Sequence, residues 1–469
     1  MNLNKFASHL SHVIQQVTGS MHVSIPDFHL DPSPQGIERA SKDPDVVSRV
    51  ESYLDEWTTS MANVIDHEHR KRRVGDRPMS EVLYWRDRDA ALAAVYEQLN
   101  VPRVKTAVEV LRAAGLTAVV HFNKHLAELL KLYTEAKDNV KFLSTLERHF
   151  KSLATGSLST LQDTIVTMLN SLRMVWVVSR HYNKDSRMFP LLTLIAREIA
   201  DRVAKEVSVR TVFRMPPQQA MALIRSAREV LNTWHTEYSK TRQRIEESGS
   251  ARWEFNRSKL FDLTDYMSSV CGHLLEVAET LDQFNKLLSP QLKAITGDPH
   301  SIDDVVQRVQ RLVIPLEHFP FHVFDPRYGS SWDQQRKEFK EEVLLIEERT
   351  KLFIHQSFKK LRSAEGAFNL LQNFSHLVLR RSIRDQLKDK YRNILEQFGE
   401  ELKLVHRQFE RYKDCPPISK SQPRVAGAIA WARSLFHRIK KPILRFKTMD
   451  GLLEDEEGLV IKQIGRAHV

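Results

Sequence analysis

The residues whose spacing best suits metal chemistry are two histidines, His121 and His125, four positions apart. On a helix this spacing puts both imidazoles on one face, where they can hold a zinc ion. The glutamate that usually follows the first histidine of such a motif is replaced by Phe122, and no third ligand is evident. The pattern therefore favours surface or packing histidines over a metal site.

A second histidine pair, His67 and His69, flanks Glu68 and runs directly into the four basic residues 70–73. Four adjacent positive charges repel a metal cation. We expect a solvated basic turn at this place.

Two acidic patterns also invite a catalytic interpretation. Asp298 stands between Gly297 and Pro299, which is typical of a turn, and Asp303 with Asp304 stands where a helix would begin. Acidic side chains in a first helical turn complement the helix dipole. Neither pattern needs an enzyme, so we expect no catalytic residue and no metal.

Phosphate-binding loops are missing from the sequence. It contains neither G-x-x-x-x-G-K-[ST] nor G-x-G-x-x-G, and its 15 glycines in 469 residues are roughly half the usual share of about 7%. Glycine supplies the tight backbone turns of such loops. We therefore expect no nucleotide site, no cofactor and no enzymatic activity within these residues.

The most one-sided charge pattern lies in residues 421–449, which contain no acidic residue. Its basic residues are Arg424, Arg433, Arg438, Lys440, Lys441, Arg445 and Lys447. Apolar residues recur between them at helical steps, with a kink predicted at Pro442. The segment is either a basic face for an acidic partner or a solvated helix rim that pairs with acids elsewhere, and the second interpretation is favoured. No known nucleic-acid-binding fold is evident around this segment, so binding to nucleic acid is not favoured.

The elements that must position these residues read as helices. Apolar side chains at Phe339, Val343, Ile346, Thr350 and Phe353 recur at steps of three and four, and the series Leu387, Tyr391, Ile394, Phe398 and Leu402 is similar. Such steps place side chains on one face of a helix. No sustained alternation with period two indicates a strand. The sequence predicts an all-α fold, an elongated series of antiparallel helical bundles or hairpins without substantial β-sheet.

Prolines mark where the helices should stop. Residues 1–45 carry Pro26, Pro32, Pro34 and Pro44 and are predicted to be an irregular lead-in. Residues 46–462 form the helical region, with breaks at 100–102, 215–217, 296–299, 319–329 and 415–423. The last residues, 463–469, match the translation of a common sequencing adapter. We expect them to be a non-native tail on a truncated chain.

Bulk composition excludes several classes of protein. Apolar residues make up 42% of the chain and charged residues 28%, which is typical of a globular protein. The two cysteines, Cys271 and Cys415, cannot make a disulfide framework and favour a reducing compartment. No signal peptide or membrane-spanning run is evident. The net charge of +11 is compatible with nucleic acid, an anionic membrane or an acidic protein lattice.

Four sequence blocks go beyond this general helical pattern. They are residues 80–88 (SEVLYWRDR) with 94–99, residues 174–183 (MVWVVSRHYN), residues 361–368 with Leu371 and Phe374, and residues 425–435 (VAGAIAWARSL). In order and spacing they resemble the N-terminal tail region of dynein heavy chains. Residues 252–255 and 296–299 are more similar to the axonemal members. The resemblance covers roughly residues 46–462.

The resemblance implies a non-motor tail, or stem, of a ciliary or flagellar dynein heavy chain. Its expected partners are intermediate and light chains, another heavy chain and, indirectly, the microtubule doublet, with no nucleic acid and no membrane. The ATPase ring of such a motor lies downstream. Trp85, Trp176, Trp253 and Trp431 are expected to be core side chains.

Three other functions compete with this interpretation. An unrelated α-helical repeat adaptor would be a pure interaction scaffold and would lack the ordered blocks. An enzyme would bind ATP by itself, and a nucleic-acid binder would show salt-sensitive binding to DNA or RNA. The arm to which the heavy chain belongs, the number of heads and the docking residues cannot be derived from these patterns.

Overall fold

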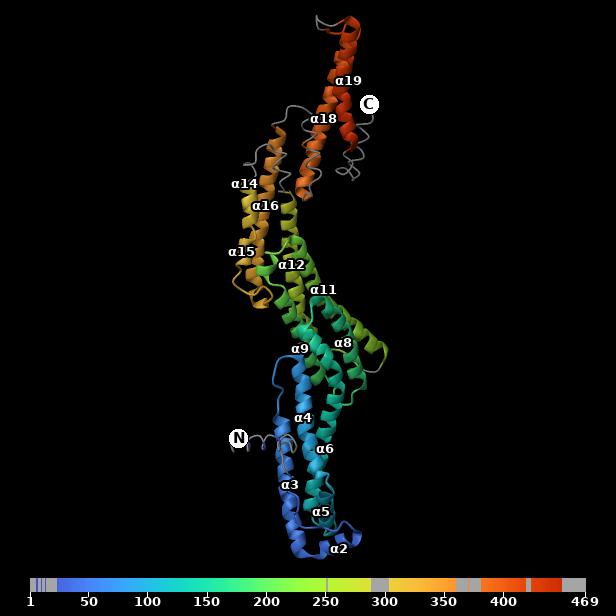
Figure 1. Ribbon diagram of the computed structural model, residues 1–469, viewed down its shortest axis with the longest axis vertical. Coiled ribbons are helices and arrows are strands. Elements are labelled where there is room, and N and C mark those ends of the chain that lie inside the picture. The colour runs from blue at the N-terminus through green and yellow to red at the C-terminus, as the bar shows by residue number, and fades with distance from the viewer. Residues whose placement is uncertain are drawn as a thin grey trace. The chain divides into compact units, whose positions relative to one another are not determined.

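The computed structural model describes residues 6, 10, 13, 23–249, 252–287, 303–359, 370, 381–418 and 423–448. Every regular element in these residues is a helix, which confirms the all-α prediction (Figure 1). The chain divides into two compact units. Unit 1 is Met1–Glu206 with Ser226–Ser269, and unit 2 is Val207–Arg225 with Val270–Val469. No helix in the described ranges is long and apolar enough to span a membrane.

Unit 1 contains most of the helices of the first half of the chain. They are α2 (Pro34–Lys42), α3 (Pro44–Arg70), α4 (Pro78–Leu99), α5 (Pro102–Ala113), α6 (Ala118–Leu143), η1 (Ser144–Leu146), α7 (Glu147–Thr155), α8 (Leu158–Val178) and α9 (Asp185–Glu206). Two further helices, α11 (Pro217–Glu247) and α12 (Arg257–Leu287), contribute residues to both units.

Proline at the first helical position starts α2, α3, α4 and α5. Its missing N–H costs nothing there, because the first amides of a helix have no intrahelical acceptor. The predicted breaks at 100–102 and 215–217 are confirmed, since α5 begins at Pro102 and α11 at Pro217.

The irregular lead-in predicted for residues 1–45 is wrong between Pro34 and Lys42, which form α2. The Ser33 side chain accepts from the Gly36 N–H, and Asp43 in turn caps α3. Pro34 and Pro44 therefore each start a helix behind a capping side chain, instead of interrupting one.

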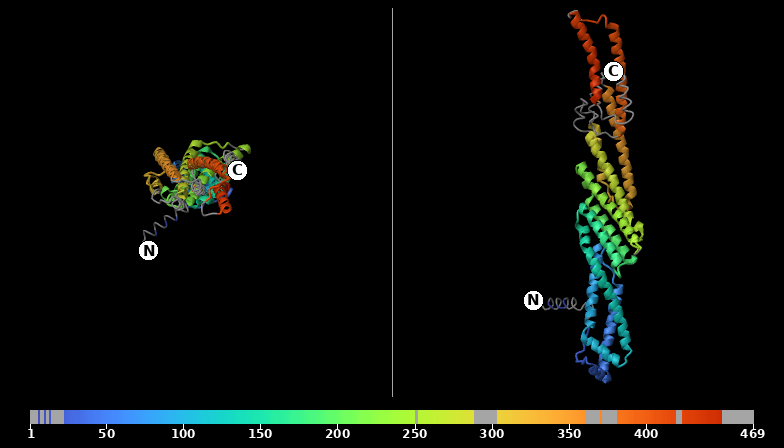
Figure 2. Two further views of the ribbon diagram at one scale, coloured as in Figure 1. Left: turned by 90° about the horizontal axis from the view of Figure 1, so that it is seen from above. Right: turned by 90° about the vertical axis from the view of Figure 1, so that its right-hand side faces the viewer.

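The core of unit 1 forms where α3 and α4 pack along α6. The three helices lie side by side in Figure 1 and in the right view of Figure 2. Leu54 and Trp57 of α3, Leu92 of α4 and Leu129 of α6 are at most 1% exposed. Burial of such side chains stabilises a fold by roughly 1.5–3 kcal/mol each.

A second part of this core is an aromatic cluster of Trp176, Tyr238, Trp253, Phe255 and Phe261. The Trp176 and Trp253 ring centroids lie 5.3 Å apart in an edge-to-face arrangement, which aromatic rings favour. The predicted core positions of Trp85, Trp176 and Trp253 are confirmed.

Unit 2 contains the remaining elements. They are α10 (Val209–Val212), α14 (Asp303–Arg311), α15 (Ile314–Glu317), η3 (Pro326–Tyr328), α16 (Gly329–Lys359), α18 (Arg381–Tyr412) and α19 (Arg424–Thr448). Helix α16 contacts α14, α15 and α18, and α18 contacts α19.

The predicted apolar series largely face this core. Phe339, Val343, Ile346 and Thr350 are buried on α16, but the series continues at Ile354 and leaves Phe353 half-buried. On α18, Leu387, Tyr391, Ile394 and Phe398 are buried and Leu402 is half-buried. A helix turns 100° per residue, so a strict seven-residue repeat drifts off the contact line.

Candidate functional site

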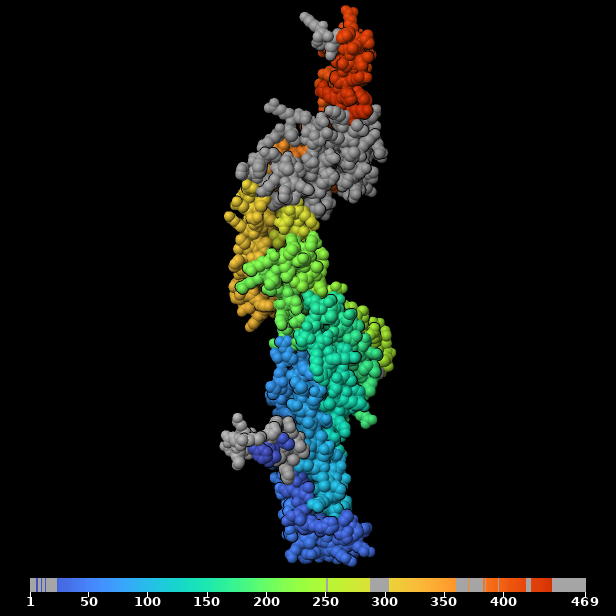
Figure 3. Space-filling model, in the orientation of Figure 1, coloured from blue at the N-terminus to red at the C-terminus, as the bar shows by residue number. Residues whose placement is uncertain are grey.

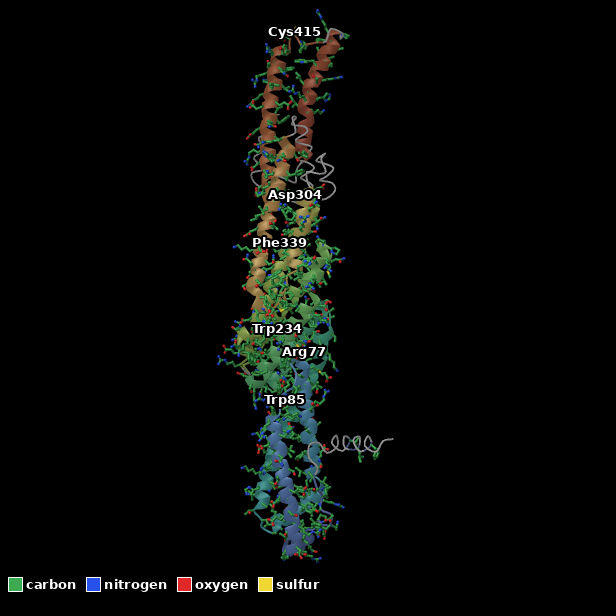
Figure 4. The ribbon with its side chains drawn as sticks, turned by 90° about the vertical axis from the view of Figure 1, so that its left-hand side faces the viewer. Arg77, Trp85, Trp234, Asp304, Phe339 and Cys415 are labelled. Atoms are coloured by element: carbon green, nitrogen blue, oxygen red, sulfur yellow. The ribbon has the colours of Figure 1, made fainter. Side chains whose placement is uncertain are left out.

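A group of buried polar side chains surrounds Glu81 in the first turn of α4, one turn before Trp85 (Figure 4). The Trp85 indole N–H donates to Glu81 Oε1 at 2.9 Å, and the Tyr182 hydroxyl donates to the same oxygen at 3.0 Å. Arg73 donates to Glu81 Oε2 at 2.9 Å. Both carboxylate oxygens are therefore satisfied, as a buried charge requires.

This arrangement joins two of the sequence blocks. Glu81 and Trp85 belong to residues 80–88, whereas Tyr182 belongs to residues 174–183 and is 101 positions from Glu81. Trp176 and Ser179 of the second block are also buried. The buried residues of both blocks thus have their partners and packing inside unit 1.

A second ion pair lies one helical turn further along α4. Arg88, 8% exposed, places its Nε 3.4 Å from Oε2 of Glu68, a residue of α3 that is 2% exposed. The Arg88 guanidinium also donates to the Tyr84 hydroxyl at 2.8 Å. A charge this far from water persists only with a partner, so the pair fixes α3 against α4.

A third cation near Glu81 and Trp85 is Arg187, which comes from α9. The Arg187 guanidinium lies 4.7 Å from the Trp85 ring centroid, and that of Arg88 lies 5.5 Å from it. Arg187 forms an ion pair with Glu135 of α6 and donates to the His181 carbonyl. Contacts of guanidinium groups with an indole are favourable by about 0.5–2 kcal/mol each.

These side chains form what we call the Glu81 network. It consists of Glu68, Arg73, Glu81, Tyr84, Trp85, Arg88, Glu135, Tyr182 and Arg187. It connects α3, α4, α6 and α9 with the segment that follows α8. Burial and the neighbouring Glu81 carboxylate raise the pKa of Tyr182 well above its ordinary value. The Tyr182 phenol is neutral, fully buried and donates to a carboxylate whose two oxygens already accept hydrogen bonds. The arrangement therefore suits a structural role, in which the network holds helices together.

A cleft of about 360 Å³ lies beside the N-terminus of α4 in unit 1. Its lining includes Arg77, Glu198, Asp201 and Arg202. Arg77 donates to Glu198 at 2.7 Å and lies 3.2 Å from Asp201, and Arg202 donates to the Gly156 carbonyl at 2.7 Å. These two guanidinium groups are already engaged by the protein.

The sequence-based candidate sites are spread over the fold. His121 is exposed and His125 half-buried on α6, and His125 Nδ1 lies 2.9 Å from the His121 carbonyl oxygen. The described residues contain no cluster of three or more His, Cys, Asp or Glu side chains that could hold a metal. Asp303 and Asp304 do begin α14, and Asp304 forms ion pairs with Arg308 and Arg349. Asp298 lies outside the described residues.

The solvated basic turn predicted at residues 67–73 is wrong in part. Glu68 is buried against Arg88, and Arg73 donates to Glu81. The sequence offered one signal for this contact. A buried tryptophan four residues after a glutamate can donate to it along the helix, and a basic run immediately before the same helix supplies the countercharge.

The remaining predictions concern residues outside the described ranges and the basic segment. The sequence block at 361–368, Leu371 and Phe374, the turn at 296–299 and the tail at 463–469 lie outside the described residues. In the basic segment, Arg438 pairs with Glu401 at 2.8 Å, which is the predicted pairing with an acid elsewhere. Trp431 is only half-buried, unlike the other three tryptophans, and Gly427 beside it is buried. Trp431 is incompletely buried because α18 covers just one side of α19.

Comparison with known proteins matches the chain to one region of one protein family. Residues 47–466 match the family described as dynein heavy chain, N-terminal region 1. The chain is 43% identical over 99% of its length to the dynein-1-alpha heavy chain of the flagellar inner arm I1 complex of Chlamydomonas reinhardtii. It is 36% identical, again over 99% of its length, to human dynein axonemal heavy chain 10. In both cases the chain spans only about a tenth of the relative, 10% and 9%.

Proposed function

The chain belongs to the dynein heavy chain family, within N-terminal region 1, and we propose that it is the tail segment that scaffolds an axonemal dynein. The family match over residues 47–466 carries this proposal. The motor part of such heavy chains lies outside this sequence, so the ATPase activity belongs to the rest of the parent protein. An unrelated helical-repeat adaptor is not favoured, because it would not match one family over nearly its whole length.

The physical properties of the fold support a scaffold. Packed helices transmit force along their axes and present long surfaces to other proteins. The Glu81 network joins helices α3, α4, α6 and α9 through partnered charges, which makes their relative placement specific. Such a framework suits a part that bears load from a motor located elsewhere in the chain.

We propose the partners at a finer level. The segment assembles into a dynein complex in the axoneme of a cilium or flagellum, where it associates with another heavy chain and holds intermediate and light chains. Contact with the microtubule doublet is then indirect, through these subunits. The names of the relatives, which are flagellar and axonemal heavy chains, support this location.

The degree of identity favours one type of arm. Identity is 43% to the dynein-1-alpha heavy chain and 27% to the dynein-1-beta heavy chain of the same complex. It is 26% and 24% to the beta and gamma chains of the flagellar outer arm. We propose that the parent protein is an inner-arm heavy chain of the alpha type.

The test is a deletion in the parent heavy chain of a ciliated cell. Removal of residues 47–448 should leave the Mg-ATPase of the purified motor part unchanged and should abolish recovery of the heavy chain in isolated axonemes. Quantitative immunoblots of axonemes measure the second quantity. Normal incorporation of the deleted protein would contradict a scaffold role, and ATP hydrolysis by the isolated 469-residue chain would contradict the non-motor assignment.

A further inference from the structure

Helices α18 and α19 form an antiparallel hairpin whose turn is marked by Cys415 (Figure 4). Phe409 of α18 stacks on Trp431 of α19 with ring centroids 6.2 Å apart, and Arg438 Nε donates to Glu401 at 2.8 Å. Leu435 is 9% exposed. These contacts bury one side of α19.

The other side of α19 carries a second apolar series. Val425, Ile429 and Phe436 are 74%, 49% and 55% exposed, and Ala432 between them is also exposed. The steps of four, three and four residues place all four side chains on one face of the helix. We call these residues the outer stripe. Helix α19 is at the surface of the hairpin in the space-filling view (Figure 3).

On the neighbouring helix, exposure of the apolar side chains rises toward the turn of the hairpin. Val405 on α18 is 3% exposed, but Phe409 and Tyr412, which continue its apolar series by four and three residues, are 44% and 36% exposed. Single exposed apolar residues are ordinary in proteins. The outer stripe instead gathers several exposed apolar side chains on one helix face, which indicates a face that another segment packs against.

Charge around the outer stripe specifies the kind of helix. Residues 424–448 contain no acidic side chain. Arg433 follows Ile429 by four positions, and Lys440 follows Phe436 by four, so both border the stripe. Lys440 Nζ lies 5.0 Å from the Phe436 ring centroid. An occupant with an apolar face and acidic residues along its edges would complement this surface.

We infer that the outer stripe is the seat of the next amphipathic helix of the same heavy chain, one with acidic residues beside its apolar face. This inference rests on the proposed function, because it requires the chain to be part of a longer dynein heavy chain. The relatives are about ten times longer than this chain, and the family match continues past α19 to residue 466. A helix tethered so close to the stripe has a high effective concentration there, which favours it over a separate protein.

The experiment supplies the next segment in trans. The probe is the stretch of about 150 residues, one domain length, that follows in the full-length transcript, produced as a separate polypeptide. Calorimetry measures its binding to the 469-residue chain. The double variant Ile429→Glu/Phe436→Glu should bind at least about 100-fold more weakly, since it puts two charges into an apolar contact.

A matched control is Val120→Glu on α6, which changes a 67% exposed valine in unit 1 and should bind like the unchanged chain. Arg433→Glu should weaken binding about 5- to 10-fold and reduce its dependence on salt. Circular dichroism of each variant checks that the helices persist, as expected for exposed positions.

Three outcomes would overturn the inference. They are no binding of the probe to the unchanged chain, equal binding to the double variant and the control, and a dimer of the chain that the double variant dissociates without a change in probe binding. The third would assign the outer stripe to a second copy. A transcript that encodes no motor downstream would instead overturn the proposed function, so the two failures are distinguishable.

Discussion

The Glu81 network in unit 1 and the α18–α19 hairpin in unit 2 differ in how they satisfy their side chains. In the network, charged groups that are 2–9% exposed have their partners within unit 1. In the hairpin, apolar side chains of the outer stripe that are 49–74% exposed line one face of α19 without cover from the described residues. The buried charges of the first region are paired within unit 1, and the second region presents a surface suited to a partner.

The difference separates two reasons for which a sequence block can be recognisable. Residues 80–88 and 174–183 meet inside one unit, where Glu81, Trp85 and Tyr182 have their partners. In residues 425–435, Gly427, Trp431 and Leu435 face the hairpin, whereas Val425, Ile429 and Ala432 do not. For the second group of side chains the explanation must lie outside the hairpin.

The largest expected effect comes from the network. Glu81→Ala removes the acceptor of Arg73, Trp85 and Tyr182, and it should lower the free energy of unfolding of unit 1 by about 3–5 kcal/mol. Urea denaturation followed by hydrogen exchange of α4 measures this change. Glu38→Ala, which removes an exposed ion pair with Lys42, is the control and should leave the denaturation midpoint where it was. Equal midpoints for both variants would end the distinction between the regions.

Tryptophan substitutions compare the two regions directly. Trp253→Ala removes a side chain that is 0% exposed and should cost about 3–5 kcal/mol of stability. Trp431→Ala removes a half-buried ring whose cover is mainly Phe409, and the cost should be roughly 1–2 kcal/mol. Thermal denaturation followed by circular dichroism measures both. A larger loss for Trp431→Ala would mean that the hairpin is already fully packed.

Tyr182→Phe removes one donor to Glu81 and should cost about 1–2 kcal/mol near neutral pH. The folded state raises the pKa of this phenol, so above the unfolded value of 10.0 the unfolded chain loses the proton first. Stability should therefore fall as pH rises beyond about 10, and the fall should be shallower in Tyr182→Phe, by up to about 1.4 kcal/mol per pH unit. Urea titrations at pH 9 to 11.5 check the slope.

Burial also raises the pKa of Tyr238 to about 12, so some alkaline loss of stability remains in the Tyr182→Phe variant. The double variant with Tyr238→Phe separates the two contributions. Identical alkaline slopes in the unchanged chain and in Tyr182→Phe would show that the hydroxyl is accessible to solvent.

The smallest expected effect is at the outer stripe. Ile429→Glu places a charge on a side chain that is 49% exposed. It should lower the free energy of unfolding by no more than about 0.5 kcal/mol and shift the melting temperature only slightly. Differential scanning calorimetry checks this. A marked loss of stability would mean that the residue is covered within this chain, and the comparison of the two regions would then fail.

The sequence by itself determined the fold class and many helix boundaries. Pro102 and Pro217 start helices because a proline N–H is not needed at that position, and this is a local property. The apolar series on α16 and α18 were predictable for a similar reason, since helical spacing alone puts them on one face. The error at Pro34 came from reading proline as an interruption where Ser33 caps a helix.

Only the tertiary structure decided which polar residues are buried. Glu81 meets Tyr182, a residue 101 positions away, and Glu68 meets Arg88 across two helices. The same letters, an acid within a basic run, describe a solvated turn or a buried ion pair equally well. The difference in free energy between these states depends on which protein groups replace water around the charge. Residues that are neighbours in sequence do not specify those groups.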